Sequence, residues 1–203
     1  DKLQKINSKF TVKADVKGTV KNVSDTADGN NKVTDVKIML GDQDVTDQFA
    51  AGVITKKDGK LTVSPKPVTL SSASVTRPYN GKELTSPEVQ GKDGFVAGEL
   101  KSAVATGKIP AAGSVKNHIE FQLNNGFRED NYTVTLNPGT LTITKVPASD
   151  LTVEVKANDH EWTYDGQSHS DNGFKVEKGL DKLQKINSKF TVKADVKGTV
   201  KNV

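Results

Sequence analysis

Apolar and polar residues alternate along most of the chain with the two-residue period of a half-buried β-strand. The alternation is clearest at 10–16, 33–38 and 132–136, where Val and Thr are frequent. Residues 100–107 are rich in Ala, but the matching stretch 191–198 alternates, so we predict strands at both. The pattern predicts an all-β protein of small domains. A β-sandwich is our first choice, and a β-grasp-like sheet is the alternative. Turns are predicted at Asp28–Asn31, Asp58-Gly59, Asn80-Gly81 and Asn137–Gly139.

The chain begins and ends with the same 23 residues. Residues 1–23 and 181–203 both read DKLQKINSKFTVKADVKGTVKNV, which is an offset of 180 positions. An identity of this length does not arise by chance, so we interpret the chain as one period of a tandem array plus a short overlap. Repeats of this kind extend a structure or multiply a binding surface.

A weaker repeat lies inside the 180-residue period. Its landmarks are a segment that begins with Pro, a Tyr-Asn/Asp-Gly turn, a Gly-Phe pair and a closing Gly-x-Leu-Thr strand. They occur at Pro67–Leu70 and Pro147–Val153, at Tyr79-Asn80-Gly81 and Tyr164-Asp165-Gly166, at Gly94-Phe95 and Gly173-Phe174, and at 138–144 and 58–64. We therefore predict a complete domain at 66–146. Residues 147–203 begin a second type of domain, and residues 1–65 are the last part of that type. Joining 147–180 to 1–65 gives one whole domain.

These landmarks resemble the MBG/YDG repeats of bacterial surface proteins. The matching stretches include Asp44-Val45-Thr46 to Phe49, closed by Gly59 to Val63, and Glu129 to Tyr132, closed by Gly139 to Ile143. The first copy departs from the pattern by having Asn80 in the turn, which Asn tolerates as Asp does. The resemblance implies extracellular, β-rich units of adhesins or large surface fibres. A secreted fold held without disulfides is a habit of Gram-positive surface proteins.

Composition narrows the function. The formal net charge is +4, with 29 Lys and Arg scattered among 25 Asp and Glu, so nothing points to nucleic acid. There is no cysteine, which excludes disulfides, thiol catalysis and Cys-ligated zinc. We see no membrane-spanning segment.

Few residues suggest chemistry. His118, His160 and His169 do not have the spacing of a metal motif, and the acidic stretch Asp25–Asn31 lacks the ligand pattern of a calcium loop. No nucleophile or phosphate-binding motif is found. We therefore predict no enzyme activity, no metal and no cofactor.

Trp162 and Tyr164 share one face of a predicted strand. They suit a carbohydrate platform, but a core residue followed by a turn-anchoring Tyr is the favoured interpretation. Tyr79, Asn80 and Gly81, and likewise Tyr164, Asp165 and Gly166, are predicted to be structural turns.

The sequence favours a structural function, as the stalk of a bacterial surface adhesin or an extracellular fibre. The expected partners are adjacent repeats, head to tail, either along one continuous chain or between chains. The alternative is a repeated module that binds host glycans or matrix proteins. Short linkers that contain Pro, Ser64–Pro67 and Lys145–Pro147, are expected to limit bending between domains.

Overall fold

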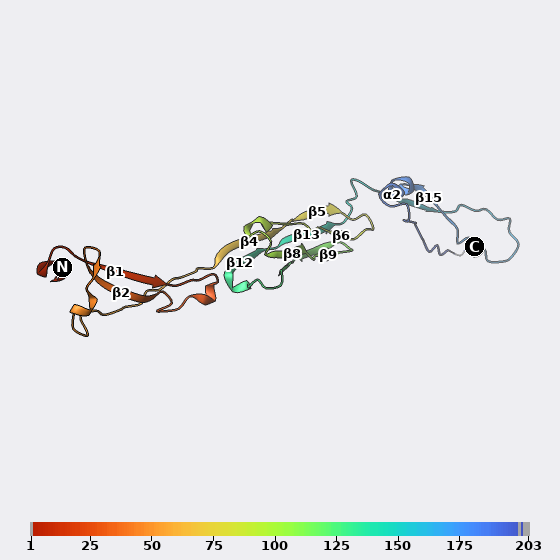
Figure 1. Cartoon of the computed structure of the whole chain (residues 1–203). Helices are drawn as coiled ribbons and strands as arrows, with labels where there is room; N and C mark the ends of the chain where they lie inside the picture. Colours follow the sequence, from red (N-terminus) through yellow and green to blue (C-terminus); the bar gives the residue numbers. More distant parts are fainter. Residues whose placement is uncertain (1, 199, 201–203) are drawn as a thin grey trace. The chain divides into compact units, whose positions relative to one another are not determined.

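The protein is described by a computed structural model that covers residues 2–198 and residue 200. The chain forms two compact units, and Figure 1 labels several of their strands and helix α2. The first comprises Asp1–Leu70, Gly91–Ala103 and Phe121–Leu136, and the second Ser71–Gln90, Val104–Glu120 and Asn137–Val203. Both consist mostly of β-strands in small sheets, as the alternating pattern predicts. The choice between sandwich and β-grasp, and the predicted boundaries at 65 and 146, stay predictions.

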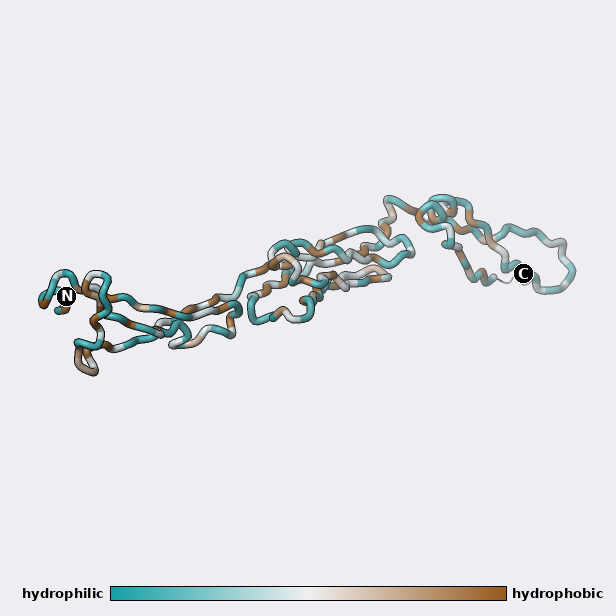
Figure 2. The backbone as a smooth tube through the Cα atoms, in the orientation of Figure 1, coloured by the Kyte–Doolittle hydropathy of each residue, from teal (hydrophilic) through white to brown (hydrophobic). Residues whose placement is uncertain are grey.

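The sheets contain two or three strands each, in the orders β1-β2-β3, β10-β13-β5, β11-β8, β12-β4-β7, β14-β15 and β6-β9. Figure 2 shows that apolar and polar positions alternate along the backbone, with no long apolar run. The strands are β1 Phe10–Lys17, β2 Lys32–Leu40, β3 Gln43–Asp44, β4 Lys66–Ser72, β5 Val75–Pro78, β6 Leu84–Thr85, β7 Val89–Gln90, β8 Leu100–Ala105, β9 Lys108–Ile109, β10 Gly113–Asn117, β11 Ile119–Leu123, β12 Tyr132–Asn137, β13 Gly139–Thr144, β14 Glu154–Ala157 and β15 Phe174–Lys178.

The helices are short. Two α-helices, α1 at Lys2–Ile6 and α2 at Leu180–Ile186, form on the two copies of the duplicated sequence. The alternation did not predict them. Four 3-10 turns lie at Val23–Asp25, Thr46–Gln48, Lys92–Gly94 and Glu129–Asn131. None of the described helices is long and apolar enough to cross a membrane.

The N-terminal strands form an antiparallel ladder. β1 pairs with β2 from Phe10↔Leu40 to Lys17↔Lys32, with a bulge after Asp15. Ile38 and Met39 are buried on β2, and the Phe10 ring packs edge-on against Phe49, with centroids 5.6 Å apart. The β1 side chains other than Phe10 are exposed. The ladder therefore has an apolar face that is only partly covered.

A second cluster in the first unit is aromatic. Phe95 packs against Phe121 and Tyr132, with centroids 5.8 and 4.9 Å apart. The Tyr132 hydroxyl donates to Glu99 Oε2 at 2.6 Å and accepts from the Val96 N–H at 3.1 Å. Burial and the bond to Glu99 raise the Tyr132 pKa. The hydroxyl thereby provides hydrogen-bond partners for the Val96 N–H and the Glu99 carboxylate beside this aromatic cluster.

The core of the second unit lies on β13. Leu141 and Ile143 are 0% and 1% exposed, and they pack with Leu84 and Ile109 under Val75, Tyr79 and Val115. β13 pairs antiparallel with β10 on one edge and parallel with β5 on the other. The parallel partners are Leu141↔Val75, Thr142↔Thr76, Ile143↔Arg77 and Thr144↔Pro78.

A polar residue of the second unit, Asn117 at the end of β10, is fully buried. Its Oδ1 accepts from the Gly107 N–H at 3.1 Å, and its Nδ2 donates to the carbonyls of Ser86 at 2.9 Å and Ala73 at 3.3 Å. The amide thus joins three chain segments, since each buried peptide group needs a partner.

Three predicted strands are absent. The stretch that contains Trp162 and Tyr164 is not a strand, and residues 191–198 and 61–64 form no ladder, although they alternate well. The reason is a missing neighbour. Residues 10–17 have the same sequence as 190–197 and are a strand because β2 lies beside them. The stretch 100–107, in contrast, is confirmed as a strand, β8, over Leu100–Ala105.

Candidate functional site

The two predicted turns share one geometry. Asn80 Oδ1 accepts from the Lys82 N–H at 3.1 Å, and Asp165 Oδ1 accepts from the Gln167 N–H at 2.9 Å. Gly81 and Gly166 have φ of +73° and +77°, where a side chain is strained. A carboxylate or amide oxygen that binds two residues ahead is the usual turn device of Asp and Asn.

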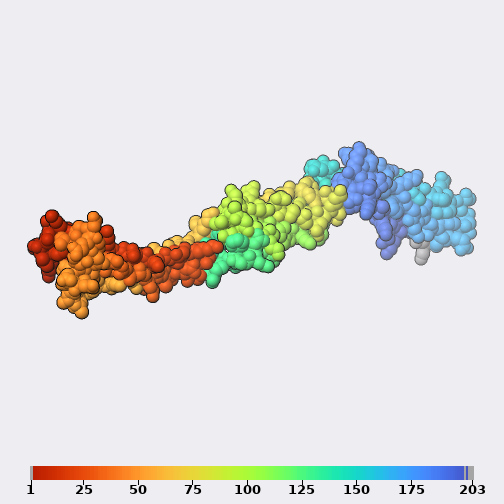
Figure 3. Space-filling model, viewed as in Figure 1, coloured from red at the N-terminus to blue at the C-terminus, as the bar shows by residue number. Residues whose placement is uncertain are grey.

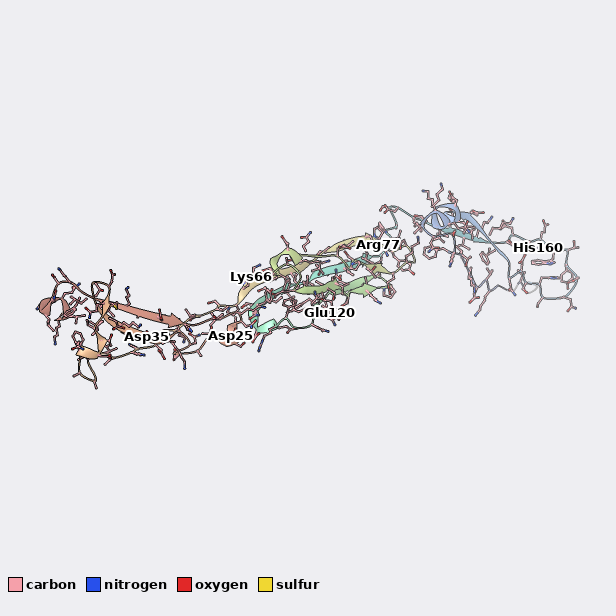
Figure 4. All side chains as sticks on the ribbon, viewed as in Figure 1. Asp25, Asp35, Lys66, Arg77, Glu120 and His160 are labelled. Atoms are coloured by element: carbon pink, nitrogen blue, oxygen red, sulfur yellow. The ribbon has the colours of Figure 1, made fainter. Side chains whose placement is uncertain are left out.

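Each turn has a further polar partner. The Arg77 guanidinium (Figure 4) donates to Asn80 Oδ1 and to the Lys82 carbonyl, both at 2.6 Å. His169 Nε2 lies 2.9 Å from Asp165 Oδ1. The Gln167 N–H and then His169 lower the Asp165 pKa, because both favour the charged carboxylate.

The first turn is covered by the segment that follows α2. Asn187 Nδ2 donates to the Asn80 carbonyl at 3.0 Å, and the Phe190 ring stacks on Tyr79 with centroids 6.0 Å apart. A Cβ on Gly81 would lie 2.6 Å from Asn187 Nδ2 and 3.1 Å from the Phe190 ring. Gly81 is therefore needed both for the backbone conformation and for this close approach.

An apolar pocket of ≈ 500 Å³ lies beside the Tyr79–Phe190 stack. Its lining side chains come from the first turn, from the loop between β9 and β10, from the chain after β13, from α2 and from the segment that follows α2. They are Tyr79, Ala111, Ala112, Lys145, Val146, Leu151, Leu183, Ile186, Phe190 and Thr191. The lining offers shape and apolar surface but little for polar recognition.

The second turn is uncovered. A Cβ on Gly166 would meet no atom within 4 Å, and the Tyr164 side chain is 77% exposed. Trp162 stacks between the His160 and His169 rings, with centroids 4.2 and 5.1 Å apart. Residues 158–168, light blue in Figure 3, are exposed throughout. The structure thus brings Trp162 together with two histidines but leaves Tyr164 apart.

The described residues do not gather into a metal site. No group of three or more His, Asp or Glu side chains that could hold a metal ion is found among them. Asp25 instead accepts from the N–H groups of Asn22 and Lys21 at 2.7 and 2.9 Å, which lowers its pKa. The predicted turn is seen at residues 28–29.

Close packing at glycines relates the C-terminal strands β14 and β15 to β4 and β7. Gly91 and Gly179 both have positive φ, and a Cβ on either would overlap a threonine carbonyl, that of Thr69 or Thr152. The match aligns β4 with β14 and β7 with β15. The predicted correspondence of Gly94-Phe95 with Gly173-Phe174 is therefore wrong, because Phe174 begins β15 and precedes Gly179, whereas Phe95 comes after Gly91.

A second match links residues 1–65 to the central strands, β4 to β13 between Lys66 and Thr144. A Cβ on Gly107 would lie 2.6 Å from Asn117 Oδ1, and one on Gly18 would lie 2.7 Å from Asn31 Oδ1. Asn117 pairs with Gly139 on β13, and Asn31 forms the same antiparallel bridge with Gly59. Asn31 is therefore the counterpart of Asn117. Within the described residues its side-chain amide has no hydrogen-bond partner.

Exposed apolar positions follow the same correspondence. Ala105 lies two residues before Gly107 and is 5% exposed, whereas Val16, two residues before Gly18, is 53% exposed. Leu61 and Val63 are only partly buried, whereas their counterparts Leu141 and Ile143 are fully buried. These apolar side chains of residues 1–65 are thus more exposed than their counterparts.

Sequence reasoning identified the two turns but missed Asn31, Asn117 and Phe190. A lone Asn in an alternating strand gives no sign that its amide joins three segments. Phe190 lies in the duplicated sequence, and its contact with Tyr79 appears only in the fold. Comparison with protein-family models, with curated proteins and with solved structures finds no match to the chain.

Proposed function

We propose that the chain is a structural repeat in the shaft of a bacterial surface protein or extracellular fibre, whose neighbours are further copies of the same repeat. The observation that carries this proposal is the 23-residue identity at an offset of 180. The correspondence of Gly18 and Asn31 with Gly107 and Asn117 supports it, because residues 18–31 repeat a packing arrangement found at residues 107–117.

Contacts next to the linkers support a stiff shaft. In the first unit, Asn131 Oδ1 accepts from the Val23 N–H, and its Nδ2 donates to Asn22 Oδ1, both at 2.9 Å. In the second, Asn187 and Phe190 bind the Tyr79-Asn80-Gly81 turn. Each set ties the central strands to residues of a neighbouring domain, so bending at the linker breaks hydrogen bonds and an aromatic contact.

The proposal places the protein outside the cell, where a fold without cysteine depends on packing alone. It includes no catalysis and no cofactor. Hydrolysis of a polysaccharide or peptide by the purified chain, abolished by substitution of one carboxylate or serine, would contradict it.

The rival function is a repeated binding module, which the exposed Tyr164 and the His-flanked Trp162 favour. Two measurements separate the functions. Small-angle scattering on chains of one, two and three periods is expected to show a maximum dimension that grows by one constant step per period. A glycan array and titration with matrix proteins are expected to show no saturable binding. Binding that Tyr164→Ala abolishes, with the fold retained, would establish the rival.

A further inference from the structure

The two ends of the chain hold complementary parts of one domain. Residues 147–200, the donor segment, contain the opening strands β14 and β15, α2 and the second copy of the duplicated sequence. Residues 24–65, the acceptor segment, contain β2, β3 and the closing Gly-Leu-Thr stretch. We propose that the acceptor segment of a second copy of the chain completes the domain that the donor segment begins.

The first support is the free edge at residues 61–64. Asn30 holds both the N–H and the carbonyl of Leu61, at 2.6 and 2.8 Å. Thr26 Oγ1 accepts from the Val63 N–H at 3.0 Å. Alternate residues of an extended chain present their peptide groups to opposite edges. Thr62 and Ser64 therefore point to the other edge, where the described residues provide no hydrogen-bond partner.

The central strands show what belongs on that edge. On β13, the carbonyl of Thr144, the counterpart of Ser64, accepts from the Tyr79 N–H at 2.9 Å. Tyr79 directly follows the parallel strand β5, and its counterpart is Tyr164. Aligning Tyr164 with Tyr79, and Gly59 with Gly139, places His160–Thr163 beside Leu61–Ser64 in the way that β5 lies beside β13. In this register the Tyr164 N–H donates to the Ser64 carbonyl.

The second support is a pairing that the donor segment already makes. In the central strands Leu84 pairs with Ile109. The counterpart of Leu84 is His169, because each lies three residues after the Gly of its turn, Gly81 or Gly166. The counterpart of Ile109 is Val200, which is the second copy of Val20. His169 and Val200 form an antiparallel bridge, and the Val200 N–H donates to the His169 carbonyl at 3.2 Å. The donor segment has therefore begun the same domain with its own copy of the duplicated sequence.

The third support is the apolar pocket at Phe190. Phe10 is the same position in the first copy, and there the ring packs against Phe49 of the acceptor segment. In the donor segment the same ring contacts Tyr79 and borders the open pocket. The occupant of the pocket is therefore Phe49 of the second copy. In the completed domain, Phe190 lies between Tyr79 and Phe49.

The acceptor's own residues 1–23 do not prevent this assembly. They are identical to the donor's 181–203, so residues 190–197 can replace 10–17 on β2 in the same register. The ladder on β2 therefore has the same sequence and register before and after the exchange. The gain comes from the new parallel pairing, from the burial of Tyr164, Leu61 and Val63, and from carbonyl partners for Asn31. A contact of this kind does not close on itself, so it propagates head to tail.

Because the chain has no cysteine, disulfide trapping tests the register directly. Thr62 and Glu161 are counterparts of the parallel partners Thr142 and Thr76. A chain with Thr62→Cys is mixed with a chain with Glu161→Cys under mild oxidation. Cross-strand partners have Cα separations that a disulfide accepts. The double variant Thr76→Cys/Thr142→Cys is the positive control, and Gln167→Cys mixed with Thr62→Cys reports random collision.

We expect reducible heterodimers from Thr62→Cys and Glu161→Cys well above the collision control. We expect ladders of multimers from a chain that carries both substitutions. Asn31→Ala is expected to reduce the heterodimer about tenfold, which corresponds to one net hydrogen bond of about 1.4 kcal/mol. A yield equal to the collision control, or closure of the double variant within one chain, would overturn the proposal. The pairing rests on the proposed repeat function, but the two claims fail on different results. Glycan binding by the chain contradicts the repeat function, whereas failed disulfide trapping contradicts the pairing.

Discussion

Asn117 offers the sharpest test of how the central strands are held together. Replacing it with Ala removes the acceptor for the Gly107 N–H and the donor for the Ala73 and Ser86 carbonyls. The residue is fully buried, so water does not replace these bonds. At about 1 kcal/mol for each of three bonds, Asn117→Ala is expected to lower the free energy of unfolding by about 3 kcal/mol. For a domain of this size that corresponds to a fall of about 12–24 °C in the melting temperature.

The assay is scanning calorimetry together with urea unfolding. The matched control is Ser114→Ala on the same strand, which removes one exposed bond to Thr142 and is expected to cost less than about 0.5 kcal/mol. Asn31→Ala is a second comparison. In the 203-residue chain its amide has no partner among the described residues, so it is expected to change stability little. A cost below about 1 kcal/mol for Asn117→Ala would refute the reasoning.

Three further outcomes are expected. Gly91→Ala places a Cβ against the Thr69 carbonyl at φ +84°, so the melting temperature should fall by at least as much as for Asn117→Ala; an unchanged melt would contradict that packing. Phe190→Ala should increase proteolysis after α2 and leave β1 protected, whereas Phe10→Ala should do the reverse, as limited proteolysis with mass spectrometry can show. Hydrogen bonds from Thr46 hold the Asp44 pKa below its usual value of about 3.9, so its stabilising contribution is present above that pH and is lost as pH falls through the lower folded pKa. Melts from pH 5 to pH 2 should therefore be less pH-dependent for Asp44→Asn, and equal dependence would count against this assignment.

Much of the strand content follows from the sequence, because alternation reports which face is buried. β2, β12 and β13 formed where Val and Thr alternate with polar residues. The failures at 61–64 and 191–198 have one cause, since a strand needs a neighbour and a local pattern cannot show whether the neighbour is present. The identical residues 10–17 and 190–197 demonstrate this, because only the copy beside β2 is a strand.

The site was harder to predict because its contacts join residues far apart in the sequence. The positive φ of Gly81 and Gly166 follows from the turn motif. Phe190 covers one turn, whereas no described residue packs on Gly166 of the other. This difference depends on α2, which the two-residue period does not indicate. The exposure of Tyr164 suggests a ligand platform when the residue is considered alone. Beside Tyr79, which packs on a buried core, it indicates a core position without its neighbour.

Hydrogen exchange at Tyr164 tests the central claim most directly. In the 203-residue chain at low concentration its N–H has no partner among the described residues and should exchange rapidly. In a chain of two periods, 383 residues (203 plus 180), the following repeat supplies residues 24–65. We predict that the Tyr164 N–H is then protected to the same degree as that of Tyr79, which is bonded to Thr144. Rapid exchange at Tyr164 in the two-period chain, with Tyr79 still protected, would contradict the account.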